Sequence, residues 1–144
     1  AEGDAPGQLK IVMRTATYEV GGRALDPPVA YSSVSVDGRE WSPGRPEPLR
    51  YNTVSKAYYG KAGNGSHVYV YSEGTPWERK ALGYRVQAPD GEWSDARVFF
   101  DTGSKNSYPT LLEYEPGEFY AVWDSSDSDT TPRQLIRFGK ISVG

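Results

Sequence analysis

The sequence predicts an all-β protein whose strands form β-propeller blades of four antiparallel strands each. Three observations support this fold class. Gly and Pro account for 27 of the 144 residues, 16 Gly and 11 Pro, which indicates many turns. Stretches rich in Ala, Leu, Glu and Lys, which would favour a helical bundle, are absent. Short strand-like segments recur about every 50 residues, a period that is typical of propeller blades.

The first repeated marker is a short apolar segment built around a central valine. It occurs as LKIVMRT at 9–15, HVYVYSE at 67–73 and FYAVWDS at 119–125. β-Branched and aromatic residues dominate each copy, so each copy predicts a buried strand. The central valines are 58 and then 52 residues apart; they are Val12, Val70 and Val122.

The second repeated marker combines Asp-Gly with Trp-Ser and a following Arg. It occurs at Ser35–Arg45 and again at Ala88–Arg97, and Trp41 and Trp93 are 52 residues apart. Asp-Gly favours a tight hairpin because glycine accepts a positive φ. Since the two tryptophans hold the same place in the repeat, we expect both to pack against their sheets.

Counting strands on this template divides one propeller-type region, residues 1–144, into three blade-like units. The units span about 8–50, 51–103 and 104–144, after a flexible lead-in at 1–7. The predicted strands lie at about 8–17, 29–36 and 40–50, then 54–62, 67–73, 81–88 and 92–100, then 107–115, 118–125 and 133–142.

Three blades are too few for a closed ring, because propellers typically have four to eight. The sequence therefore predicts about three blades, half or a fragment of a six-bladed propeller. A longer polypeptide or a second copy of the chain would complete it. The alternative is a compact sandwich of two sheets, which a chain of this length would suit.

The composition argues against several classes of protein. Net charge is −3 and Lys and Arg are scattered, so no nucleic-acid partner is expected. The chain has no Cys and a single His, His67, so we expect neither a Cys or multi-histidine metal site nor a cofactor. No apolar run reaches the roughly 18 residues of a membrane-spanning helix, so no membrane partner is expected.

The element at Ser35–Trp41 resembles the Asp-box of BNR-repeat proteins, although it is one residue shorter. The order of segments over residues 9–141 is similar to the C-terminal half of a sialidase-like propeller. The resemblance implies a six-bladed propeller with a site at the centre of one face. In active members an arginine cluster binds the sugar carboxylate, a Tyr paired with a Glu attacks the anomeric carbon, and an Asp is the acid/base. That Asp and the first arginine precede the matched segment of the family pattern.

The resemblance also suggests site residues. Tyr108, in Ser-Tyr-Pro-Thr-Leu, matches the catalytic tyrosine, although active members more often carry Tyr-Ser-x-Leu. Arg14, at the end of the first valine strand, is a substrate-binding candidate because a guanidinium binds a carboxylate through two parallel hydrogen bonds. Lys56 and Tyr58 mark a similar strand entry, and Trp77 could stack on a sugar from a loop. For each residue, ordinary packing or pairing is the alternative interpretation.

These features lead to three functional hypotheses, and they leave open whether the protein is an enzyme. The first is a sialidase-like propeller half that recognises or hydrolyses an acidic glycan, as an exo-glycosidase if active. The second is a non-catalytic BNR-repeat scaffold that binds glycan or protein. The third and weakest is a polysaccharide lyase, for which His67 would be the only histidine. The small, polar N-terminal segment and the resemblance favour a secreted or periplasmic location, with a cytoplasmic one left open.

Overall fold

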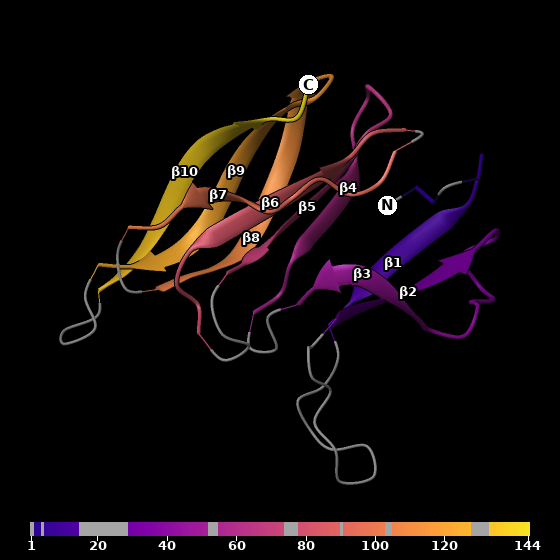
Figure 1. Ribbon diagram of the computed structural model, residues 1–144, viewed down its shortest axis with the longest axis horizontal. Coiled ribbons are helices and arrows are strands. Elements are labelled where there is room, and N and C mark those ends of the chain that lie inside the picture. Colours follow the sequence, from indigo (N-terminus) through magenta and orange to yellow (C-terminus); the bar gives the residue numbers. More distant parts are fainter. Residues whose placement is uncertain are drawn as a thin grey trace, which may run out of the picture.

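The computed structural model describes residues 2–3, 5–14, 29–51, 55–73, 78–89, 91–102, 105–127 and 133–144, and these residues form an all-β structure without helices. The described strands form three antiparallel sheets (Figure 1). The first sheet contains β1 (Leu9–Met13), β2 (Val29–Ser35) and β3 (Arg45–Arg50). The middle sheet contains β4 (Tyr58–Lys61), β5 (His67–Ser72), β6 (Leu82–Gln87) and β7 (Arg97–Phe100). The last sheet contains β8 (Lys105–Glu115), β9 (Glu118–Ser126) and β10 (Gln134–Ser142).

Each sheet is a simple meander, because every strand pairs with its neighbour in the chain. The strand orders are β1-β2-β3, β4-β5-β6-β7 and β10-β9-β8. The predicted strands and their division into units of three, four and three are thus confirmed among the described residues. The predicted extension of the first strand to residue 17 lies partly outside the described residues.

Three strands begin later than predicted: β4 begins at Tyr58 instead of about 54, and the other two begin late for a shared reason. The expected strands at 40–50 and 92–100 begin at Arg45 and Arg97. Before each of these two strands, a serine hydroxyl accepts the hydrogen bond that a backbone carbonyl would accept in a regular pair of strands. The Ser42 N–H donates to Val34 O at 2.9 Å, while its Oγ accepts from Val34 N at 3.1 Å. Ser94 makes the equivalent bonds to Val86, at 2.8 and 3.1 Å, so the repeat extends to individual hydrogen bonds.

The three sheets stack in chain order, with the middle sheet between the other two (Figure 1). We call the face of a sheet that points toward the following sheet its front face, and the opposite face its rear face. Side chains alternate between the faces along β5. Val68 and Val70 belong to the cluster shared with the last sheet, whereas Tyr69 and Tyr71 belong to the cluster shared with the first sheet.

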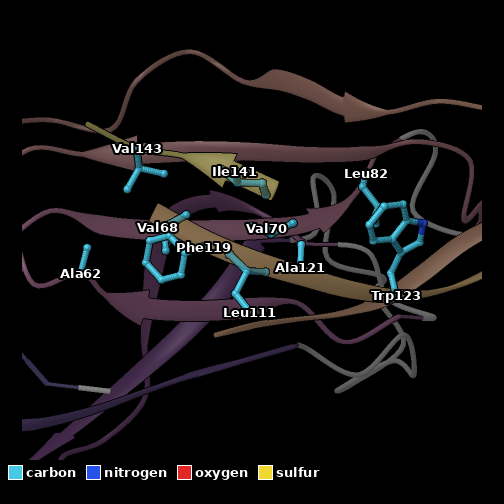
Figure 2. Packing of buried hydrophobic residues seen from close by; sticks show 10 residues of the cluster. All are labelled: Ala62, Val68, Val70, Leu82, Leu111, Phe119, Ala121, Trp123, Ile141 and Val143. Carbon is cyan, nitrogen blue, oxygen red and sulfur yellow. The ribbon is translucent and has the colours of Figure 1, made fainter. Parts of the chain in front are cut away.

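The contact between the middle and last sheets is the larger apolar cluster (Figure 2). Aliphatic and aromatic side chains of both sheets take part in this contact. Phe99 and Phe100 on β7 pack edge-on or tilted against Trp123, with ring centroids 5.1 and 5.0 Å from it. The buried members are Ala62, Val68, Val70, Leu82, Leu111, Phe119, Ala121, Trp123, Ile141 and Val143.

The contact between the first and middle sheets is rich in tyrosine. Ala30 and Leu49 of the first sheet pack with Tyr69 and Tyr71 of the middle sheet, and with Tyr51. The Tyr69 hydroxyl donates to the carbonyl of Arg50 at 3.0 Å, which ties the two sheets together. Burial raises the pKa of Tyr69 well above its usual value.

Only one of the three valine segments is buried on both faces. All six residues of β5 are buried, but β1 and β9 alternate between covered and exposed positions. Val122 on β9 is 41% exposed, which corrects the prediction of a fully buried strand. The reason is the position of β9 in the stack. The middle sheet covers its rear face, and no described segment covers its front face.

The tryptophans of the repeat also differ. Trp93 packs against Tyr59 and Tyr69, with centroids 6.3 Å from each ring, as predicted. Trp41, at the equivalent position of the first sheet, is exposed, so the prediction that it packs is wrong. The rear face of the middle sheet is covered by the first sheet, whereas no described segment covers the rear of the first sheet.

The Asp-Gly element forms the expected turn at Asp37. Its carboxylate accepts from the N–H groups of Arg39 and Glu40, at 2.8 and 3.0 Å, and from the Ser35 hydroxyl at 3.0 Å. Gly38 follows with φ of 73°. These hydrogen bonds, the one from Arg39 first, lower the pKa of Asp37 below its usual value.

We expect Ser35→Ala to raise the pKa of Asp37 toward its ordinary value, because one donor to the carboxylate is lost. A carboxyl titration by NMR measures this. A lowered pKa means that the stabilisation from Asp37 is present above its unfolded-state pKa and is lost as pH falls through the folded-state pKa. Identical titration curves in the two proteins would contradict this account of the turn.

Val70→Ala should lower the free energy of unfolding by about 2–3 kcal/mol, since it removes fully buried methyl groups and leaves a cavity. Val98→Ala is the matched control, because Val98 is largely exposed on β7 and the same change should cost about 0.5 kcal/mol or less. Urea unfolding of both variants tests the difference. Equal losses would mean that the stacked core is absent.

Candidate functional site

Tyr108 lies in a bulge near the start of β8. The register changes between Ser107, opposite Asp124, and Thr110, opposite Val122, so β8 carries one extra residue there. Tyr108 has φ of 53°, and it is the one non-glycine residue with positive φ among the described residues. Its neighbour Pro109 restricts it further, because a residue before proline favours extended backbone. Such a conformation costs about 1–3 kcal/mol and persists where surrounding contacts enforce it.

Asn106 provides much of that enforcement. It is fully buried, and all the hydrogen-bonding positions of its side-chain amide are used. Its Nδ2 donates to the carbonyls of Lys80 and Thr102, at 2.6 and 3.0 Å. Its Oδ1 accepts from Trp123 Nε1 at 3.2 Å and from Ser125 Oγ at 2.9 Å. One side chain therefore joins β8 and β9 to the segments before β6 and after β7.

The backbone of Asn106 extends this network to the loop that carries Arg79. Its N–H donates to the Arg79 carbonyl at 2.5 Å, and its own carbonyl accepts from the Ser72 hydroxyl at 3.0 Å. The position of the Arg79 backbone is thus fixed relative to β8. Tyr108 is only two residues beyond Asn106 on the same strand, so both groups are held in one frame.

Arg79 and Tyr108 contact each other directly. The Arg79 guanidinium donates from Nη2 to the Tyr108 hydroxyl at 3.1 Å, and its Cζ lies 4.9 Å from the centre of the ring. This combines a hydrogen bond with a cation–π contact. Tyr108 remains 38% exposed, so the pair is accessible from solvent. Among the described residues, the hydroxyl of Tyr108 contacts this cation and no carboxylate.

Lys56 and Ser55 complete the group around Tyr108. The Tyr108 N–H donates to Ser55 Oγ at 3.1 Å, which brings the entry of β4 against the bulge. Lys56 is exposed and donates from Nζ to Thr110 Oγ1 at 3.3 Å. We call these five residues, Ser55, Lys56, Arg79, Tyr108 and Thr110, the Tyr108 cluster. It offers two cations, hydroxyl groups and an aromatic ring on one surface.

The other predicted site residues lie elsewhere. Arg14 is exposed beyond the end of β1, and its charge acts on Tyr51. Burial raises the pKa of Tyr51, while a hydrogen bond from the Ala57 N–H and the charge of Arg14 lower it. No contact joins Arg14 to the described residues of the Tyr108 cluster. Trp77 lies outside the described residues.

Tyr58 does not join the Tyr108 cluster. It packs half-buried against the core between the middle and last sheets and lines a cavity of about 730 Å³ with Lys61 and Glu113. Burial, and then the negative charge of Glu113, raise the pKa of Tyr58. Tyr58 and Lys56 both face the last sheet, but Tyr58 lies further along, beside Glu113, whereas Lys56 contacts Thr110.

Among the described residues, the Tyr–Glu pair joined by a hydrogen bond is not accessible. The Tyr71 hydroxyl donates to Glu73, and burial followed by this interaction raises the pKa of Tyr71 well above its usual value. Tyr71 is buried in the tyrosine-rich core, so it cannot reach a sugar from that position. His67 is buried as well, with its ring stacked on Tyr59 at 5.5 Å, and it does not offer an exposed base of the kind a lyase needs.

A second cavity, of about 830 Å³, lies between the first and middle sheets at the end where β5 begins. Lys10 and Glu47 form an ion pair of 2.8 Å within it, and Trp93 forms part of its wall. Arg85 donates to the carbonyls of Ser94 and Pro48. The ion pair lies within the first sheet, whereas the bond from Arg85 to the Pro48 carbonyl joins the middle sheet to the first.

Within the described ranges, no three His, Asp or Glu side chains gather as a metal site would require. Nor do those residues include a helix long and apolar enough to cross a membrane. Comparison with protein-family models, curated proteins and solved structures finds no significant match to this chain.

Sequence reasoning found Tyr108 and Lys56 but missed Arg79, Ser55 and Asn106. The contacts that join Asn106 to Arg79, Arg79 to Tyr108 and Ser55 to Tyr108 link positions 27, 29 and 53 apart in the chain, and no local pattern specifies them. The one available signal was Asn-Ser-Tyr-Pro itself. A proline inside a strand pattern marks an edge or a bulge.

Asn106→Ala should lower the free energy of unfolding by about 3 kcal/mol or more, because it leaves several buried donors and acceptors without partners. Asn64→Ala is the control, since Asn64 is exposed, accepts from the Ser66 N–H at 3.0 Å and donates a long bond to the Val143 carbonyl at 3.5 Å. It should cost about 1 kcal/mol or less. Urea unfolding compares the two. A small loss for Asn106→Ala would show that the network does not hold the bulge.

Proposed function

We propose that this chain is a sialidase-like propeller segment that recognises an acidic glycan at the Tyr108 cluster. The three meander sheets, stacked front to rear in chain order, support a propeller-type arrangement. The equivalent bonds of Ser42 and Ser94 support a repeated blade-like unit. The expected ligand, an acidic glycan, rests on the resemblance of the Ser35–Trp41 element and of the segment order to sialidase-like propellers.

One observation carries the choice of site. Tyr108 is held in a strained conformation, exposed, and in contact with Arg79. Strain of this kind clusters at ligand-binding and active sites, where it fixes a side chain before the ligand arrives. An ordinary surface tyrosine would need neither the bulge nor the buried Asn106 network beneath it.

The chemistry of the cluster suits a sugar that carries a carboxylate. Arg79 and Lys56 would provide positive charge, and a charge-assisted hydrogen bond to a carboxylate is stronger than a neutral one. The ring of Tyr108 would pack against the sugar, and the hydroxyls of Tyr108 and Thr110 would bond its polar groups, while the buried Ser55 holds the backbone of Tyr108. The charge of Arg14 acts on Tyr51, whose hydroxyl accepts from the Ala57 N–H next to Lys56.

We favour recognition over hydrolysis because of what surrounds the phenol. Glycoside hydrolysis needs an acid/base group at the scissile bond, and sialidases in addition use a tyrosine nucleophile. In the described part of the chain, Tyr108 meets a guanidinium instead of a carboxylate. Such a pair is suited to hold an anion.

Arg79→Ala should weaken binding of a sialic acid-terminated trisaccharide at least about tenfold, which corresponds to roughly 1.4 kcal/mol. Isothermal titration or ligand-observed NMR measures this. Arg133→Ala removes an equally charged side chain that lies outside the Tyr108 cluster and pairs with Asp127 at 3.1 Å, and it should leave affinity unchanged. The asialo sugar should bind weakly and lose little further affinity in Arg79→Ala. Absence of any binding to the wild-type chain would overturn the proposal.

A fluorogenic sialoside separates recognition from catalysis. We expect no turnover by the wild-type chain, and Tyr108→Phe should weaken binding only modestly, since it keeps the ring and loses one hydrogen bond. Turnover that disappears in Tyr108→Phe would contradict the proposal of recognition alone. It would identify Tyr108 as a catalytic residue.

A further inference from the structure

Two outer faces of the sheet stack carry exposed apolar side chains. On the front of the last sheet, Ile136 is 77% and Phe138 64% exposed. On the rear of the first sheet, three residues of β1 are each 37–42% exposed; they are Leu9, Ile11 and Met13. Contiguous apolar surface of this kind marks an interaction site in most proteins.

The repeat shows that these faces are equivalent to faces already in contact. With the spacings of 58 and 52 residues, Ile11, Tyr69 and Ala121 occupy the same position. Tyr69 and Ala121 are buried by the preceding sheet, whereas Ile11 is exposed. The rear of the first sheet therefore has the residues of a contact face but no described segment against it.

The front faces follow the same rule. Leu82 pairs with Ser72, and Ile136 pairs with Asp124, which lies 52 residues after Ser72. Leu82 and Ile136 are thus equivalent, yet Leu82 is completely buried under the last sheet. The front of the last sheet repeats the buried front of the middle sheet.

The two outer faces also offer the two kinds of side chain that meet between the first and middle sheets. There, the aliphatic side chains of Ala30 and Leu49 pack with Tyr69 and Tyr71. The front of the last sheet has Tyr114, Tyr120 and Phe138 in ring contact beside the exposed Ile136, and the rear of the first sheet is aliphatic. A contact between the two outer faces would therefore also join aromatic and aliphatic side chains.

Pairing of the last sheet with itself is disfavoured. Lys140 lies on this front face, with Nζ 5.0 Å from the Tyr114 ring and 5.3 Å from the Tyr120 ring. Two such faces in contact would bring two ammonium groups together in an apolar interface, which costs free energy. The first sheet of the same chain cannot cover the front face of the last sheet either, because the middle sheet lies between these two sheets (Figure 1).

We propose that the front face of the last sheet binds the rear face of the first sheet of a second copy. Two copies joined head to tail make two identical contacts and close a ring of six sheets. Contacts of this type close when the rotation per copy fits and otherwise extend into filaments. The proposal concerns assembly and stands independently of the glycan proposal.

Light scattering coupled to gel filtration, applied to the chain as given, measures the assembly. The expected mass is twice the chain mass of 15.9 kDa. Ile136→Lys on the front face and Ile11→Lys on the rear face should each raise the dissociation constant at least about 100-fold, because each substitution damages both contacts of the ring. Val98→Lys, which places the same charge at an exposed position of β7, should leave the dimer intact.

Mixing the two variants gives the sharpest test. A pair made of one Ile136→Lys chain and one Ile11→Lys chain keeps one intact contact, so the mixture should dimerise more tightly than either variant alone. Circular dichroism confirms that each variant is folded; should Ile136→Lys unfold, Phe138→Ser on the same face replaces it.

Three results would overturn the proposal. A wild-type chain that stays monomeric at high micromolar concentration would show that another partner covers these faces. An Ile11→Lys dimer alongside an Ile136→Lys monomer would mean that the front face pairs with itself. A mass that keeps growing with concentration would mean that the contacts form but do not close.

Discussion

The two-sided burial of β5 is the constraint on which the rest of the structure depends. Six successive residues of this strand are buried, so both of its faces must be covered at once. Alternation sends Val68 and Val70 to one side and Tyr69 and Tyr71 to the other. A shift of one residue would exchange the valines with the tyrosines and spoil both contacts. The stack of three sheets in chain order follows from this strand.

The Asn106 network determines how the stack supports a surface site. Its amide joins β8 and β9 to segments on either side of the β6–β7 pair, and its backbone holds the Arg79 loop. These buried hydrogen bonds, together with the one from the Tyr108 N–H to Ser55, hold the backbone of Tyr108 in its strained conformation. A ligand at this surface would meet side chains that are already positioned, which lowers the entropic cost of binding.

The ends of the stack show that burial is a property of position and not of residue type. Val70 and Val122 are the same residue at the same place in the repeat, and one is buried while the other is exposed. Trp93 and Trp41 differ in the same way. These differences arise where a neighbouring sheet is missing, and they define the two faces that we assign to a second copy.

The sequence by itself determined the β class, the ten strands and their grouping, because alternating apolar residues and turn-forming glycines act over a few neighbours. It also singled out Tyr108, although only through a resemblance. It could not place Arg79 beside Tyr108 or Tyr58 beside Glu113, since those contacts depend on strand register and on how the sheets pack. Nor could it tell which copy of the repeat would be buried. Tertiary structure alone decided this, because a side chain is removed from water by whichever sheet lies against it, and distance along the chain does not encode that neighbour.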